Sequence, residues 1–217
     1  MFVEKWMTPD PVTLPNDTTI SRVAVEMSRR KFRHFPITER TRNGAPRLVG
    51  IVAKYDIARG FPSNLNPFSV EVHEDSVPRP VSSVMSRNVV TTTPDCPVEE
   101  AAKLLSTNRI GALPVMRENR LVGIITESDV FEALMSVTAA KSGGTRIMIA
   151  SDSRTSPVPD VIQLSRRYRL DLMSILSFHE NRLRDQDVSI FRFGSRLPSG
   201  LVQDLADLGF RIVSAGS

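Results

Sequence analysis

Two polar side chains, Thr126 and Asp129, stand where a predicted strand ends and a predicted helix begins. The N–H groups and the dipole of a helix N-terminus favour an anionic group. The Thr126 hydroxyl can donate to a phosphate oxygen, and the ionised Asp129 carboxylate, which only accepts, suits the paired hydroxyls of a ribose. The segment is thus equipped to recognise a nucleotide-like molecule. In the alternative interpretation, Asp129 is only a helix cap and Thr126 only a turn residue.

Both residues lie in the second of two similar stretches, which run from about residue 3 to 60 and from about 81 to 134. Self-similarity of this kind indicates a repeated structural unit. Each copy ends in an aspartate, Asp56 or Asp129, six residues after a glycine. The other matches follow in the same order: Trp6-Met7-Thr8 with Val84-Met85-Ser86, Phe35-Pro36-Ile37 with Leu113-Pro114-Val115, and Leu48–Val52 with Leu121–Ile125.

Each copy is predicted to be a small α/β unit. The runs Ile20–Met27 and Val98–Leu105 place apolar residues at helical spacing. Two short apolar strands joined by a polar turn follow, and the second is apolar throughout, which suggests burial on both faces. The last helix of each copy begins near its aspartate. The unit therefore presents its polar residues at the end of a buried strand.

This ordered set of features, present twice, resembles the CBS domain, a module named for cystathionine β-synthase. The resemblance covers about residues 3–135 and implies a first domain at 1–62, a linker at 63–80 and a second domain at 81–140. It implies that the two copies lie side by side around a cleft for AMP, ADP, ATP or S-adenosylmethionine. It also implies a non-catalytic regulator that requires no cofactor and signals to a regulated enzyme or another protein.

By the same resemblance, each cleft takes residues from both copies, so that Phe32, Arg33 and His34 would face Thr126 and Asp129. Arg33 suits a phosphate because its planar guanidinium can donate two parallel hydrogen bonds. His34 would add a donor or a pH-dependent charge. We expect this to be the better of two ligand sites.

The reciprocal site is expected to be weak or vacant. Asp56 is present there, but Ala53 stands at the position that matches Thr126, so the hydroxyl is missing. Lys54 would supply a compensating charge. The residues opposite offer backbone and apolar contacts without charge: Ile110, Gly111 and Ala112.

Residues 145–217 are predicted to form a separate domain, set off by the small residues of 139–144. Their patterns follow in the order β-α-β-β-α-β, the ferredoxin-like unit. After a CBS pair, this order resembles the ACT-like domain of acetoin-utilisation regulatory proteins. The turn at 153–159 lacks the glycine typical of ACT domains, and Pro157 and Pro159 have no N–H to donate. We therefore expect a homodimerisation or partner surface here rather than an amino-acid site.

The composition disfavours other classes of protein. The net charge of +4 is spread over 217 residues, so a nucleic-acid-binding regulator, suggested by Arg166, Arg167 and Arg169, is the weaker alternative. The one cysteine, Cys96, and the lack of metal-ligand or catalytic motifs predict neither a metal site nor an enzyme. Without a signal peptide or a membrane-length apolar run, a cytoplasmic location is expected. A ligand-free oligomerisation module stays open as an alternative.

Overall fold

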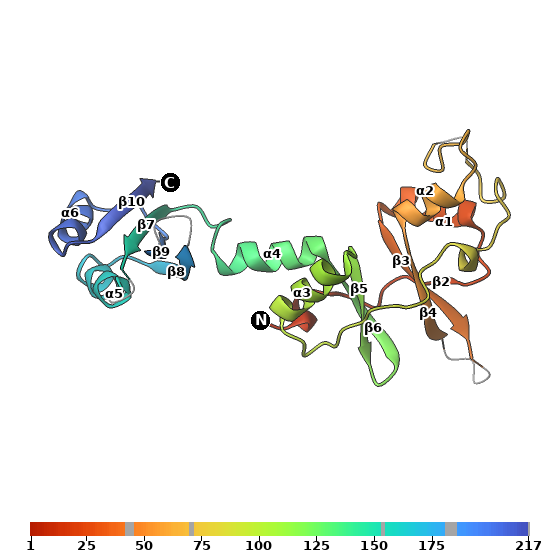
Figure 1. Cartoon of the computed structure of the whole chain (residues 1–217), viewed down its shortest axis with the longest axis horizontal. Helices are drawn as coiled ribbons and strands as arrows, with labels where there is room; N and C mark the ends of the chain where they lie inside the picture. Colours follow the sequence, from red (N-terminus) through yellow and green to blue (C-terminus); the bar gives the residue numbers. More distant parts are fainter. Residues whose placement is uncertain (42–45, 70–71, 153–154, 181–185, 217) are drawn as a thin grey trace. The chain divides into compact units, whose positions relative to one another are not determined.

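The computed structural model describes residues 1–41, 46–69, 72–152, 155–180 and 186–216. The chain divides into two units, Met1–Ala133 and Leu134–Ser217 (Figure 1). The first unit holds two three-stranded sheets, with strand orders β2-β3-β4 and β1-β6-β5. Its elements, with the helix that leads out of it, are the 3-10 helix η1 (Val3–Lys5), β1 (Thr8–Pro9), β2 (Leu14–Pro15), α1 (Ile20–Arg30), β3 (His34–Arg40), β4 (Pro46–Ala53), α2 (Lys54–Gly60), the 3-10 helix η2 (Val81–Ser83), α3 (Val98–Asn108), β5 (Ala112–Arg117), β6 (Arg120–Thr126) and α4 (Glu127–Val137).

The two repeats predicted from the sequence have equivalent hairpins. Strands β3 and β4 pair antiparallel, and so do β5 and β6. The pairing register shifts after Ile37 in the first hairpin and after Val115 in the second. These are matched positions of the repeat, so the internal similarity extends to an irregularity of the backbone.

The N-terminal segment of each repeat packs on the other repeat. Val3 is fully buried in the hydrophobic core of the second repeat, and the backbone N–H of Val3 donates to the carbonyl of Cys96 at 2.9 Å. Strand β1 then pairs with β6 through Thr8 and Ile124. In return, Val81 and Met85 are buried in the core of the first repeat. This exchange brings the segment after Thr8 beside the end of β6, where the predicted site lies.

Helix α1 ends at a turn that positions the start of β3. The helix begins at Thr19, whose side chain accepts from the backbone N–H of Arg22 at 3.2 Å, and it buries one apolar face. It ends at Lys31, which has a left-handed φ of 61° and donates its N–H to the carbonyl of Met27. The chain therefore reverses within Lys31–Arg33 and enters β3 at His34.

The segment 63–80, predicted to be a linker, packs back on the first repeat in its described part. The Ser21 hydroxyl, fully buried on α1, donates to the carbonyl of Glu74 and accepts from the backbone N–H of Val77. Val72 is buried in the same core. The connection is thus fixed to the first repeat by specific contacts.

The second unit has the predicted order of elements. It contains β7 (Thr145–Ser151), α5 (Val158–Arg167), β8 (Leu172–Glu180), β9 (Gln186–Phe193), α6 (Ser199–Asp207) and β10 (Arg211–Gly216). The four strands pair antiparallel in the order β10-β7-β9-β8. Ile149 and Phe191 of the sheet pack with Val161 and Leu201 of the two helices in one core. Ser153 and Arg154 of the turn considered above lie outside the described residues.

No helix among the described residues combines the length and the apolar character that crossing a membrane requires.

Candidate functional site

The two residues first singled out, Thr126 and Asp129, are in direct contact. Thr126 ends β6 and Asp129 lies in the first turn of α4. The Oδ2 atom of Asp129 accepts from the backbone N–H of Thr126 at 2.8 Å and from its hydroxyl at 2.7 Å. The carboxylate therefore caps the helix, as in the simpler interpretation, and both hydrogen bonds use the same oxygen atom.

This contact changes the role that the Thr126 hydroxyl can play. A threonine hydroxyl has one proton and two acceptor lone pairs. In the structure the hydroxyl donates to Asp129, which leaves its lone pairs as acceptor sites. Together with Oδ1 of Asp129, it forms a pair of acceptors that suits vicinal hydroxyl groups.

Arg33 reaches from the first repeat to the start of α4 in the second. Its Nη2 atom donates to Oγ of Ser128 at 2.8 Å. Ser128 lies between Glu127 and Asp129 in the first helical turn, where the helix N-terminus also favours negative charge. The structure thus places a guanidinium and a helix N-terminus side by side.

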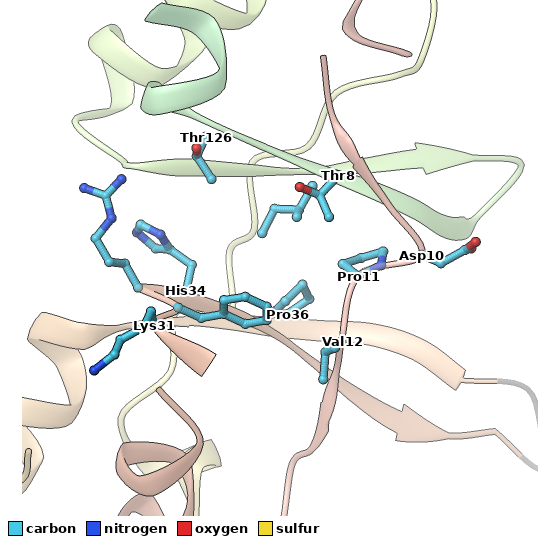
Figure 2. Close-up of a pocket in the computed structure, with 11 residues that line it drawn as sticks. Thr8, Asp10, Pro11, Val12, Lys31, His34, Pro36 and Thr126 are labelled. Atoms are coloured by element: carbon cyan, nitrogen blue, oxygen red, sulfur yellow. The ribbon is translucent and has the colours of Figure 1, made fainter. Parts of the chain in front are cut away.

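A cavity of about 250 Å³ lies between these elements of the two repeats (Figure 2). Of the five residues predicted for the better site, Phe32, Arg33, His34 and Thr126 line it, and Asp129 adjoins it through Thr126. Figure 2 shows the His34 ring directed from β3 toward Thr126 on β6. The remaining lining residues were not predicted: Thr8, Asp10, Pro11, Val12, Lys31, Pro36 and Ile124.

Most of the unpredicted lining residues belong to the segment Thr8–Val12 or to the end of α1. The segment Thr8–Val12 reaches the cavity because β1 pairs with β6 of the other repeat. Lys31 lies there because it ends α1 directly before the predicted Phe32. The repeat alignment matched Thr8 to Ser86, and this match was the available signal that the N-terminal segment has a structural role. It did not show on which repeat the segment packs.

The His34 ring is half-buried and contacts Gly111, where an added Cβ would come within 2.9 Å of two ring atoms. Burial lowers the pKa of His34, and the neighbouring Arg33 charge lowers it further. Glu127 and Asp56 act in the opposite direction on the same pKa. The net effect of these surroundings is a lowered pKa, which favours the neutral form of the ring.

The residues of the predicted weaker site do not line this cavity. Asp56 caps α2 by accepting from the backbone N–H of Ala53 at 2.9 Å, with no hydroxyl beside it. The Lys54 ammonium lies 4.3 Å from the centre of the Phe68 ring. Of the other three predicted residues, Gly111 lies against the His34 ring, Ala112 is buried, and Ile110 packs against the core of the second repeat.

Within the described ranges, no three side chains of histidine, cysteine, aspartate or glutamate are grouped so that they could hold a metal ion. Cys96 is partly buried, and its Sγ lies 3.4 Å from the carbonyl of Pro97.

Comparison with known proteins agrees with the duplicated unit. The sequence model of the CBS domain matches residues 3–63 and 81–136. A CBS domain-containing protein of Dictyostelium discoideum is 31% identical over 142 residues, which are 63% of this chain and 93% of that protein. Homoserine O-acetyltransferase of Methanohalobium evestigatum is 28% identical over 130 residues, but these are 23% of its length and 59% of this chain.

Two solved structures share the fold of the matched region. The CBS domain pair of protein MJ0100, solved with 5′-methylthioadenosine and S-adenosyl-L-methionine, is 27% identical, with a TM-score of 0.51 over 62% of this chain and 95% of its own. An acetoin utilization protein of Vibrio cholerae is 28% identical, with a TM-score of 0.51 over 65% of this chain and 95% of its own. With two matched copies, equivalent hairpins and a cavity between them, the chain belongs to the CBS domain family.

Proposed function

We propose that the two repeats form a non-catalytic regulatory module that binds an adenine nucleotide or a related adenosyl ligand in the cavity of Figure 2. The observation that carries the proposal is the convergence of Arg33 and His34 from one repeat with Thr126 and Asp129 of the other. The relative solved with adenosyl ligands supports it, since the matched regions are similar over nearly the whole of that chain.

The cavity offers a separate environment for each part of such a ligand. The Arg33 guanidinium and the N-terminus of α4 favour a phosphate or another anionic group. The acceptor pair of Thr126 and Asp129 suits the ribose hydroxyls. Val12, Pro36 and Ile124 provide apolar contact for a base, which is the usual mixture of apolar walls and few polar groups in small-molecule sites.

Two hydrogen bonds to charged groups contribute roughly 1.5–3 kcal/mol each. Their sum is a large part of the roughly 8 kcal/mol that corresponds to micromolar binding. In this proposal, the site of Asp56, Lys54, Ile110, Gly111 and Ala112 binds an adenosyl ligand weakly or not at all, because it lacks the hydroxyl and the guanidinium.

A thermal-shift panel of AMP, ADP, ATP and S-adenosylmethionine tests the proposal. A ligand at a hundredfold excess over its dissociation constant should stabilise the folded protein by about 2.7 kcal/mol. Asp129→Ala should abolish this stabilisation, whereas Asp56→Ala, which removes the equivalent cap of the other repeat, should retain it. If none of the four compounds raises the melting temperature of the natural sequence, the proposed sensing function is wrong for these ligands.

The regulatory part of the proposal is a change in the relative orientation of the two repeats. Arg33 and Thr126 come from different repeats, so a ligand that contacts both favours one arrangement of the pair. The partner that senses the change is proposed to be a regulated enzyme or another protein in the cytoplasm.

We propose further that the second unit is an ACT-like, ferredoxin-fold domain that forms a homodimer. Its β-α-β-β-α-β order and its sheet order support the fold. Strand β8 lies at one edge of that sheet and exposes Met173, Ile175, Leu176 and Phe178. From Leu172 to Phe178 the strand has no charged residue, and charges are a common protection of exposed edges.

Analytical ultracentrifugation tests the homodimer. Leu176→Lys places a charge on the exposed edge and should give a monomer. Leu208→Lys, at another exposed leucine after α6, should leave the dimer intact. Equal sedimentation of both variants and the natural sequence would exclude β8 as the dimer contact.

A further inference from the structure

The contact between His34 and Gly111 joins the two predicted sites. A Cβ on Gly111 would lie 2.9 Å from both Cε1 and Nε2 of His34, a distance that real Cβ atoms do not tolerate. The φ of Gly111 is not in the left-handed region, so a side chain at this position would not strain φ. The imidazole ring, rather than the φ of the backbone, is therefore what an added side chain would displace.

This contact has no counterpart at the equivalent positions of the two repeats. His34 pairs with Ala53 across the first hairpin, and Ala112 pairs with Thr126 across the second, so His34 and Ala112 are equivalent. The residues before them, Arg33 and Gly111, are equivalent too. One repeat thus supplies a ring and a cation, and the other supplies the space that receives the ring.

The charged groups around His34 come from both repeats. Arg33 precedes it in the chain, Glu127 faces it from the first turn of α4, and Asp56 faces it from the first turn of α2. Lys31 lines the same cavity, and Gly111 adds no charge. A ring displaced from Gly111 would lose part of the burial that lowers its pKa.

We propose that Gly111 is a positioning residue for His34, and that the seated imidazole contacts the anionic group of the ligand in the cavity. The proposal rests on the proposed adenosyl ligand and assigns Gly111 to the better site, as the support of a ligand contact. In this proposal, a residue of the second repeat determines the position of a histidine that belongs to the first repeat.

The contact between His34 and Gly111 is tested without ligand by an NMR titration of the His34 Cε1–H. This signal is assigned from its loss in His34→Gln. Gly111→Ala should raise the pKa of His34, because the displaced ring loses part of the burial that lowers this pKa. Gly216→Ala, at a glycine with nothing within 4 Å of an added Cβ, should leave it unchanged. His73 and His179 serve as internal references. An unchanged His34 pKa in Gly111→Ala would overturn the positioning role.

The ligand contact is tested by calorimetry with AMP and adenosine. His34→Gln and Gly111→Ala should each weaken AMP about tenfold and the double variant no further, because they remove the same contact. Adenosine, which lacks the anion, should bind all variants equally. If His34→Gln binds AMP like the natural sequence, the proposed contact is wrong. The natural sequence could bind neither compound while Gly111→Ala still raises the pKa of His34. The proposed adenosyl function would then be wrong, and the positioning role of Gly111 would be supported.

Discussion

The starts of α2 and α4 are the same structure with different chemistry. In both, an aspartate caps the first turn by accepting from the backbone N–H three residues earlier, at 2.9 Å for Asp56 and 2.8 Å for Asp129. Among the described residues, the second copy alone has a hydroxyl that donates to the same carboxylate and an arginine from the other repeat beside the helix. The shared cap therefore belongs to the fold, and we propose that the residues around it decide whether it can recognise a ligand.

The largest expected effect is on the free energy of unfolding, and it concerns the buried core that each repeat has. Phe35 and Leu113 are matched and fully buried in separate cores. Phe35→Ala should cost about 3–5 kcal/mol and Leu113→Ala about 2–5 kcal/mol of unfolding free energy, since each leaves a cavity. Urea unfolding measures both. A negligible loss in one variant only would show that the repeats do not contribute equivalent cores.

The next largest effect is on AMP affinity and concerns the positive charge of Arg33. Arg33→Gln should weaken AMP by about 1.5–3 kcal/mol, because a charge-assisted hydrogen bond is lost, and should leave adenosine nearly unchanged. Lys54→Gln, at the first residue of α2, is the matched control and should change neither affinity. Calorimetry at one salt concentration gives the four values. Equal losses of AMP affinity in the two variants would mean that Arg33 has no specific role in binding the anionic group.

The two copies differ in one hydroxyl, which Thr126 has and Ala53 lacks. A substitution at either position removes this difference. Thr126→Ala should lower ligand affinity by about 1 kcal/mol, the typical net contribution of one hydrogen bond. Ala53→Thr gives the first repeat the hydroxyl that it lacks beside Asp56, and weak binding should become measurable there. Titration calorimetry of both variants gives affinity and stoichiometry. Tighter binding in Thr126→Ala would reverse the account of the acceptor pair.

The smallest effect is a pH dependence of stability in the unliganded protein. Burial lowers the folded-state pKa of His34 below its ordinary value of about 6.5, so the unfolded chain binds the proton more readily. The contribution of His34 is therefore complete above that value and is lost as the pH falls through the folded-state pKa. Melting temperatures from pH 7.5 to 5 should fall more steeply for the natural sequence than for His34→Gln. Parallel profiles would contradict the burial of the ring.

The repeat and the order of elements could be predicted from the sequence because their signals are local. The helical spacing of Val98–Leu105 and the apolar run of Leu121–Ile125 both correspond to observed elements. The convergence of Arg33 with Thr126 came from the family resemblance, since 93 residues separate them in the chain.

Other features depend on tertiary structure and have no sequence pattern of their own. The exchange that buries Val3 in the opposite core moves Asp10 and Val12 to the cavity. The hydrogen bond from the Thr126 hydroxyl to Asp129 depends on side-chain geometry, so it could not be predicted from the sequence. Gly111 appeared to be a poor ligand residue, because the ring that fills its space comes from the other repeat.

Titration calorimetry of the natural sequence, Asp129→Ala and Asp56→Ala with AMP and S-adenosylmethionine tests the central difference most directly. We predict one site per chain for at least one of the two ligands, lost in Asp129→Ala and kept in Asp56→Ala. Binding that disappears with Asp56 and survives without Asp129, or two equal sites per chain, would contradict the account.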